Sequence, residues 1–179
     1  MGDEKDLEVY AIGNKRATAF IKYSGVLDML ELLRFIKNWF GKRYYDVAEK
    51  EHSELVKSAG KEITIEFEAD RKITEYVRFK INVRIYILRL IDVLIDTPEG
   101  KEKKQQGEVE IGVKSWMVKN YKGTFKKKEK SKIQEFFRQV YERFIGKTHL
   151  DNLKKKLETE TLMLIDEIKT SLNIFKRSS

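Results

Sequence analysis

This 179-residue chain has many carboxylates but only two histidines, and few of these side chains cluster in the sequence in a way that could bind a metal ion or transfer protons. The densest group lies in residues 49–54, which contain Glu49, Glu51, His52 and Glu54. Successive side chains of a strand face opposite ways, so in a regular strand Glu49 and Glu51 face away from His52. Only two of the four groups could then converge, and we expect a solvated strand here rather than a metal site.

Other candidates for chemistry are weaker. Asp92 and Asp96 share one strand face near a turn without a third ligand nearby, and His149 falls in the first turn of a helix. The chain has no cysteine, which excludes thiolate metal sites and disulfides. The sequence shows neither a convergent acid–base pair nor a glycine-rich phosphate loop. We therefore predict no catalytic residue, no metal site and no cofactor, and we expect that the protein is not an enzyme.

A basic segment is the strongest compositional signal. The net charge is +8, with −3 in residues 1–70 and +11 in residues 71–179. Residues 119–132 contain one glutamate and seven lysines: Lys119, Lys122, Lys126, Lys127, Lys128, Lys130 and Lys132. Tyr121 and Phe125 lie among them, and aromatic rings stack on bases while cations pair with phosphates. The segment is either a solubilising loop or a surface that binds RNA, a ribosomal surface or acidic lipid headgroups.

A second basic patch is predicted in residues 76–87, YVRFKINVRIYI. Alternation places the aliphatic side chains on a core face and the polar ones on an outward face. The outward patch, with one residue from a later strand, is Arg78, Lys80, Arg84, Tyr86 and Trp116. Glu66, Glu68 and Glu110 on neighbouring strands could pair with these cations, each pair contributing about 0.2–1 kcal/mol. We favour a charge-paired outer face, and the alternative is a binding platform.

The N-terminal part of the chain, before the two basic patches, predicts a strand and a helix. Residues 8–23 predict a short hairpin or a bent strand, with Gly13–Asn14 as the turn. Apolar residues then recur at helical spacing over residues 25–40, with Ser24 as N-cap and Gly41 as the stop.

The middle of the chain predicts an antiparallel meander over residues 44–122. Alternating segments flank a turn at residues 57–61, and the strand that starts at residue 76 continues to the TPEG turn at residues 97–100. A polar run, KEKKQQ, follows that turn, and the next strand begins with Gly107. Short turns between successive strands favour antiparallel pairing.

Two helices are predicted after the sheet. The first covers residues 131–146, with a capping-box pattern at Ser131 and Gln134. The second begins after a cap at Thr148 and runs for about 25 residues, roughly 37 Å.

The predicted fold is a single α+β domain over residues 1–179: an N-terminal strand or hairpin and helix (1–41), an antiparallel sheet (44–122) and C-terminal helices (131–175). The meander sheet packs against the long C-terminal helix, with an extra helix before the last one. The acidic N-terminus has no apolar signal region, and arginine, lysine and aspartate interrupt the most apolar window, 77–95. We expect a cytoplasmic protein without a transmembrane segment.

This order of elements resembles START-type helix-grip domains. More specifically, Trp39 together with YYDVAEKE (44–51), EYVRFKINVRIYI (75–87) and GEVEIGVKSWMVKNYKG (107–123) resembles uncharacterised small proteins of archaea. The resemblance implies a curved sheet around the last helix, and helix-grip domains often hold an apolar ligand between the two. The extra helix departs from the usual order and could fill that space.

From these observations we predict a non-enzymatic, basic binding protein whose partner is structured RNA or a ribonucleoprotein such as the ribosome. One alternative is a carrier of an apolar or amphiphilic ligand in a helix-grip cavity. The other is an oligomerising adaptor, with a homodimer formed through the C-terminal helix.

Overall fold

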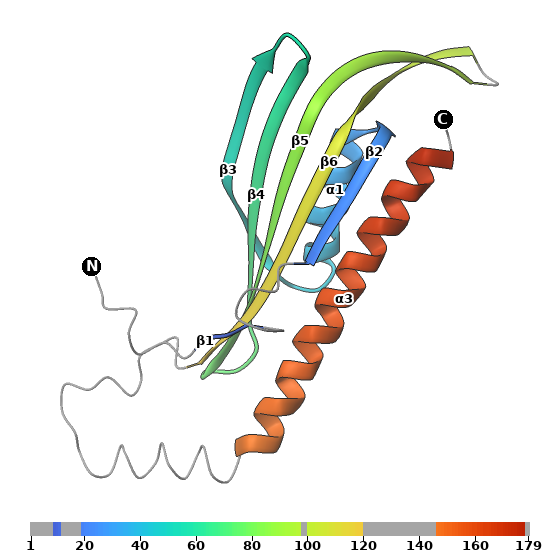
Figure 1. The fold of residues 1–179 in the computed structure, drawn as a ribbon. Helices are drawn as coiled ribbons and strands as arrows, with labels where there is room; N and C mark the ends of the chain where they lie inside the picture. Colours follow the sequence, from blue (N-terminus) through green and yellow to red (C-terminus); the bar gives the residue numbers. More distant parts are fainter. Residues whose placement is uncertain (1–8, 12–18, 98–99, 120–145, 178–179) are drawn as a thin grey trace.

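The fold, given by a computed structural model, is α+β, as predicted. The structure describes residues 9–11, 19–97, 100–119 and 146–177. Within these residues, one six-stranded antiparallel sheet carries helices α1 and α3 on the same face (Figure 1). We call this the inner face, and the opposite one the outer face.

The sheet is a meander flanked by two short N-terminal strands. Its strands are β1 (Val9–Ala11), β2 (Ala19–Leu27), β3 (Asp46–Lys57), β4 (Gly60–Lys72), β5 (Val77–Thr97) and β6 (Gly100–Lys119). The order across the sheet is β1-β6-β5-β4-β3, and β2 pairs with β6 as well. The predicted antiparallel meander is confirmed, and β3 forms one edge of the sheet.

The N-terminal strands do not form a hairpin with each other. Both pair antiparallel with β6: Val9 lies opposite Val118, and Ala19 lies opposite Val113. β1 and β2 therefore lie one after the other along the same side of β6. This agrees with the predicted bent strand and not with the alternative, a hairpin. The predicted turn at residues 13–14 lies outside the described residues.

Helix α1 (Met29–Gly41) starts later than the sequence pattern predicts. Its N-cap is Asp28, whose carboxylate accepts a hydrogen bond of 2.9 Å from the Glu31 amide. The predicted cap, Ser24, is wrong because β2 continues through it, with Ser24 opposite Glu108 on β6. Pairing with β6 therefore keeps this segment extended up to Leu27.

Strands β5 and β6 extend together into a long hairpin arm. The polar run after the TPEG turn is a strand and not a loop, because Lys101–Gln105 pair with Asp92–Asp96. The register shifts between Leu88 and Ile91, where Arg89 has φ 53°. Beyond this irregularity the two strands curve away from the rest of the sheet (Figure 1).

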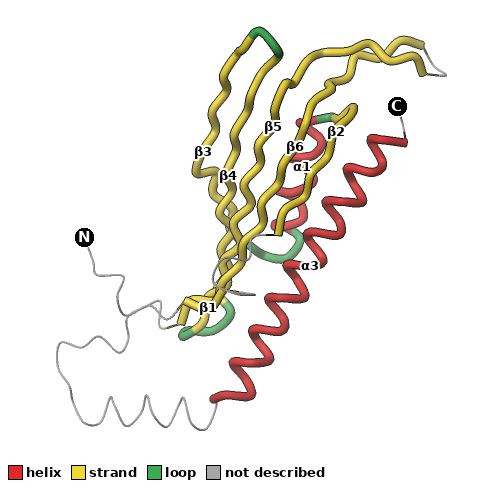
Figure 2. Tube along the Cα trace, viewed as in Figure 1, coloured by secondary structure: helices red, strands yellow, loops and turns green. Residues whose placement is uncertain are grey.

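Helix α3 (Lys147–Arg177) has 31 residues and is longer than predicted. Because the helix already includes Thr148, the predicted cap at that residue is wrong. Thr161 on α3 donates a 2.8 Å hydrogen bond to Ser115 on β6, and α3 runs along the molecule beside β2 (Figure 2). The predicted helix over residues 131–146 lies outside the described residues, apart from Gly146.

The core fills the space between the inner face and the two helices. The β5 side chains from Phe79 to Ile87 that face inward are 0% exposed. Leu157, Leu164 and Ile168 of α3 are also 0% exposed. Neither of the helices that the structure describes is both long enough and apolar enough to cross a membrane.

Candidate functional site

A row of residues in register crosses the outer face of the sheet. Phe20 on β2 lies opposite Gly112 on β6, and Gly112 lies opposite Arg84 on β5. Beyond Arg84 come Glu66 on β4 and Glu51 on β3. Strand pairing therefore fixes the order of an aromatic ring, a position without a side chain, a cation and two carboxylates.

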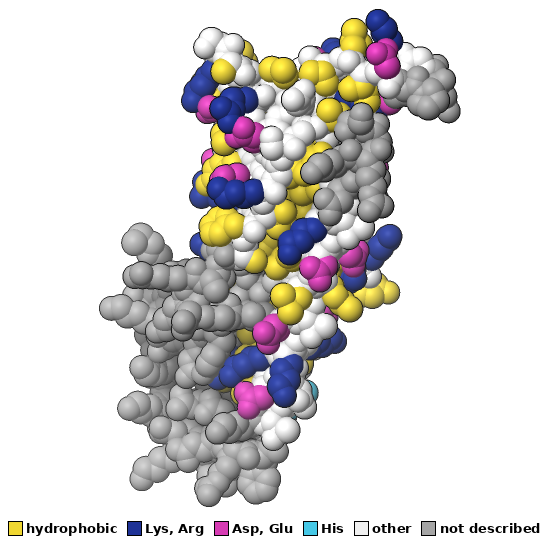
Figure 3. Space-filling view, turned by 45° about the vertical axis from the view of Figure 1, so that its right-hand side comes forward, with side chains coloured by type: hydrophobic (Ala, Val, Ile, Leu, Met, Phe, Trp, Pro, Cys, Tyr) yellow, Lys and Arg dark blue, Asp and Glu magenta, His cyan; other side chains and the backbone are white. Residues whose placement is uncertain are grey.

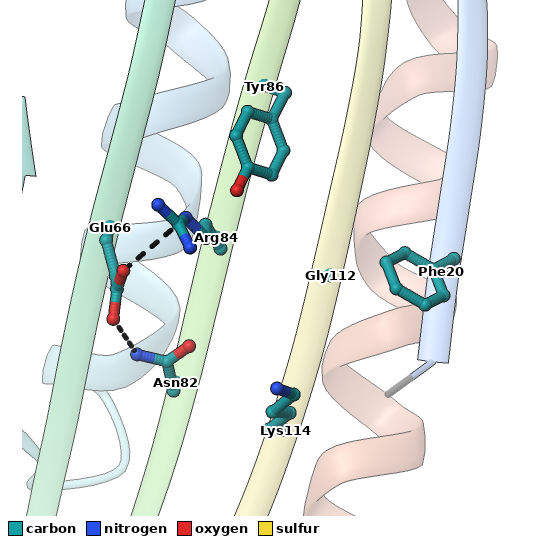
Figure 4. Close-up of a pocket in the computed structure, with 7 residues that line it drawn as sticks. All are labelled: Phe20, Glu66, Asn82, Arg84, Tyr86, Gly112 and Lys114. Atoms are coloured by element: carbon teal, nitrogen blue, oxygen red, sulfur yellow. Dashed lines mark hydrogen bonds and ion pairs between the residues drawn. The ribbon is translucent and has the colours of Figure 1, made fainter. Parts of the chain in front are cut away.

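A hollow of about 240 Å³ lies on the outer face beside Gly112, which carries no side chain. Its lining residues surround Gly112 in Figure 4, with α3 behind the sheet: Phe20, Glu66, Asn82, Arg84, Tyr86, Gly112 and Lys114. This volume lies below the roughly 300–1,000 Å³ of pockets for drug-sized ligands. The hollow is open to solvent, so a planar ring fits inside it while a group attached to that ring lies at its rim.

Arg84 is held on one side of this hollow by acidic neighbours. Its Nη2 atom is 3.0 Å from Glu51, and its Nε atom is 3.5 Å from Glu66. Asn82 donates a 2.7 Å hydrogen bond to Glu66 as well. The guanidinium carbon lies 5.1 Å from the centre of the Tyr86 ring, within cation–π range. The left side of the hollow in Figure 4 is therefore preorganised by the protein's own contacts.

The other side of the hollow presents groups that can bind a ligand. Within the described part of the chain, the exposed Lys114 ammonium has no ion-pair partner. The ring of Phe20 is 66% exposed. Lys114 can bind an anion, and Phe20 offers a flat apolar surface, so the hollow suits an anionic group attached to a planar ring.

The five residues of the predicted patch share this outer face. Lys80 is 3.0 Å from Glu68, and Arg78 is 3.1 Å from Asp70. Trp116 lies opposite Lys80 on β6. The prediction that Glu66 and Glu68 pair with cations of β5 is confirmed.

The third predicted acid has a different partner. Glu110 pairs with Lys22 of β2 at 2.6 Å, and this contact raises the pKa of Lys22. Charge pairing thus covers much of the outer face, and among the described residues Lys114 stays without an ion-pair partner at the hollow.

The basic segment falls almost entirely outside the described residues. Lys119 is the last residue of β6 and is 8% exposed. The other six predicted lysines lie outside the described residues: Lys122, Lys126, Lys127, Lys128, Lys130 and Lys132.

The acidic cluster of β3 differs from the regular strand that we expected. The register shifts between Glu49 and Glu51, so Glu49 and His52 lie on the same face and are 2.9 Å apart. The predicted opposition of these two residues is wrong because of this irregularity. The Lys37 ammonium of α1 is 2.9 Å from the Glu49 carboxylate. The hydrogen bond from Lys37, followed by the one from His52, lowers the pKa of Glu49.

The remaining candidates are already paired or exposed. Asp92 contacts Lys103 at 2.9 Å, which lowers the pKa of Asp92. His149 is exposed on α3. Among the described residues, no three histidine or carboxylate side chains come together as metal ligands.

A second hollow, of about 310 Å³, lies between the start of α1 and the hairpin arm. Its charged groups already have partners: Lys103 contacts Asp92, Lys104 contacts Glu102, and Asp28 caps α1. This second hollow therefore has fewer groups available to bind a ligand than the hollow at Gly112 has.

Sequence reasoning left Phe20, Asn82, Gly112 and Lys114 out of the predicted patch. A glycine inside a strand often marks a close approach or a missing side chain, and this signal could have pointed to Gly112. No local signal places Phe20 beside Gly112, because that contact depends on β2 pairing with a strand about 90 residues later.

Comparison with known proteins adds no assignment: no family model matches the chain, and no curated protein matches it.

Proposed function

We propose that this chain is a non-enzymatic, basic binding protein of the cytoplasm whose partner is structured RNA or a ribonucleoprotein such as the ribosome. The observation that carries the proposal is the outer-face hollow, where Lys114 and the exposed Phe20 lie beside Arg84 and Tyr86. RNA-binding sheets commonly combine these features, since rings stack on unpaired bases and cations bind the backbone.

The charge distribution supports an extended RNA contact. The second part of the chain carries the positive excess, and six lysines follow β6 closely in the sequence. Neither described helix covers the outer face, so a large polymer could approach it (Figure 1). In this proposal the lysines after β6 contact phosphates, and the outer face contacts bases.

The inner face favours RNA over the apolar carrier. A ligand cavity between the sheet and the helices requires side chains that leave space beside them. The inward side chains of β5 are 0–3% exposed, and Leu157 and Leu164 of α3 are 0% exposed. The described interior is thus filled by the protein itself.

The proposal is tested by titrating purified, nucleic-acid-free protein with total RNA at several salt concentrations. If about six lysines contact single-stranded phosphates, the log–log salt slope is roughly −4. A protein that shows no salt-sensitive binding at low ionic strength contradicts the proposal.

A matched pair of triple variants locates the contact. Replacing Lys126, Lys127 and Lys128 by glutamine should weaken binding and reduce the slope by roughly 2. The same change at the other run of three lysines, Lys154–Lys156 on α3, should leave the RNA affinity and the salt slope unchanged. Equal losses in the two variants would indicate a general charge effect.

An oligomerising adaptor is a second candidate. It is favoured by Leu162 and Met163 on α3, which are 55% and 50% exposed. In Figure 3, hydrophobic side chains interrupt the charged ones along the face that α3 crosses. Light scattering tests it directly: a monomer over a wide range of protein concentration excludes a homodimer through this helix.

A further inference from the structure

We propose that the hollow around Gly112 binds one unpaired nucleotide, with its base between Phe20 and the Arg84–Tyr86 pair and its phosphate on Lys114. This inference rests on the proposed function and names the part of the RNA that the hollow takes. It concerns a single nucleotide, so it can be tested apart from RNA binding as a whole.

The spacing of the strands fits a base. Phe20 and Arg84 flank Gly112 on its two neighbouring strands. They are therefore separated by two strand spacings, about 9.5 Å. With no side chain at Gly112, one flat ring has room between the Phe20 ring and the guanidinium–phenol pair. Any side chain larger than hydrogen at residue 112 would point into this space.

The electrostatics place the phosphate near Lys114 rather than near Arg84. Arg84 already contacts both Glu51 and Glu66, and a phosphate there would approach two carboxylates. Lys114 has no carboxylate partner among the described residues. An anion therefore gains most beside Lys114, whereas the planar guanidinium of Arg84 remains available for stacking.

Polar groups near the base position allow hydrogen bonds to its edge. The Tyr86 hydroxyl has no hydrogen-bond partner within the described residues, and in Figure 4 it lies at the end of the ring nearer to Arg84. Asn82 donates its amide to Glu66, so its carbonyl oxygen remains an acceptor. These groups can bond to a base but not to an aliphatic chain, which favours a nucleotide over a fatty acid.

The test uses the full chain with adenosine 5′-monophosphate and with adenosine, followed by heteronuclear NMR. Both ligands should shift the amide signals of Gly112 and Phe20, and the monophosphate should bind more tightly. Phe20→Ala should weaken both ligands by roughly tenfold, because it removes a stacking surface. Lys114→Ala should weaken only the monophosphate, by up to roughly fivefold.

Two control variants match these changes elsewhere on the surface. Tyr44→Ala removes an aromatic ring that is 87% exposed, and Lys155→Ala removes an exposed lysine of α3. Neither should alter the affinity for adenosine or its monophosphate. All four positions are solvent-accessible, so we expect each variant to fold.

The outcomes separate this inference from the proposed function. If millimolar monophosphate leaves the Gly112 and Phe20 signals unchanged while total RNA still binds with a salt-sensitive affinity, the nucleotide site is wrong and the proposed function stands. If Lys155→Ala matches Lys114→Ala, the binding is non-specific and the site is again wrong. If neither RNA nor the monophosphate binds, both proposals fail.

Discussion

Glu160 of α3 joins the helix to the sheet and to the loop before β3. Arg71 of β4 donates to both carboxylate oxygens at 2.8 Å, and Tyr45 donates a further hydrogen bond of 2.8 Å. Arg71 also donates to the carbonyl oxygen of Arg43. The Arg71 and Glu160 side chains are only 15% and 13% exposed. Their charges are stable in this position because each compensates the other.

Removing one of these two charges should be far more costly than breaking an ion pair in solvent. Arg71→Met leaves the part-buried Glu160 carboxylate without its cation and should lower the free energy of unfolding by up to about 3–5 kcal/mol. Lys22→Met breaks the pair with Glu110, in which the lysine is 74% exposed, and should change stability far less. Urea unfolding measures both. Similar losses in the two variants would show that the Glu160 cluster is not a special contributor to stability.

Tyr45 should make stability fall at high pH. Burial, and then the Glu160 carboxylate, raise the pKa of Tyr45, so the folded protein retains a proton that the unfolded chain releases near pH 10. Above about pH 10 the unfolded state binds fewer protons than the folded state, and the free energy of unfolding decreases with pH. The stability that this group contributes is complete below that pH and is lost above it.

Tyr45→Phe isolates this contribution. At neutral pH the variant should be less stable by about 1–2 kcal/mol, because it lacks the hydrogen bond to Glu160. The difference from the wild type should shrink as pH rises above about 10, by at most about 1.4 kcal/mol per pH unit. Urea unfolding at neutral and alkaline pH gives both numbers, and a difference that is constant with pH contradicts the assignment.

At the scale of elements, the sequence predicts which face of a single strand is buried. It does not predict register or pairing between two strands. Alternation identifies the inward faces of β4, β5 and β6, because one buried face imposes a period of two. The register shift after Glu49 has no such signal, since both faces of β3 are polar there. The start of α1 at Met29 was likewise missed, because pairing with β6 overrides the local preference of Ser24 to cap a helix.

The candidate site divides in the same way. Arg84 and Tyr86 belong to one strand, and their shared face follows from alternation. Phe20 joins them only because β2 lies along β6, and this long-range pairing cannot be derived from the residues near Phe20. The acidic partners of Arg84, Glu51 included, depend on the register between strands. A shift of one residue would move them to the other face of the sheet.

The turn between β3 and β4 should not tolerate a side chain at Gly60. This glycine has φ +121°, and a Cβ atom there would lie 2.9 Å from the Arg89 carbonyl carbon. Gly60→Ala should lower the free energy of unfolding by more than about 1 kcal/mol. Gly41, at the end of α1, has open space around it and no positive φ. Gly41→Ala should therefore be neutral or stabilising by up to about 1 kcal/mol. Equal effects in urea unfolding would contradict the strain at Gly60.

For the whole molecule, the sheet separates the core from the face that carries the proposed site. The inner face holds the buried core and both described helices, whereas the outer face holds paired charges and the hollow at Gly112. Surface substitutions away from a core usually change stability by less than about 0.5 kcal/mol. The exposed residues of the proposed site, such as Phe20 and Lys114, can therefore be substituted while the fold is retained.

We expect helix α3 to unfold together with the sheet, although it comes last in the chain. Its buried residues complete a single core with β2, β6 and α1. Leu164→Ala removes a side chain that is 0% exposed and should cost about 2–5 kcal/mol. Leu162→Ala, at a site that is 55% exposed on the same helix, should change stability by less than about 0.5 kcal/mol.

The two variants also test whether the molecule unfolds as one. In Leu164→Ala, tryptophan fluorescence, which includes the buried Trp39 of α1, and far-UV circular dichroism should show the same lowered midpoint. The physical reason is that α1 and α3 share the core over the inner face, so loosening one exposes the apolar surface of the other. A fluorescence midpoint that stays at the wild-type value while the helical signal is lost early would mean that α3 detaches from an independently stable sheet.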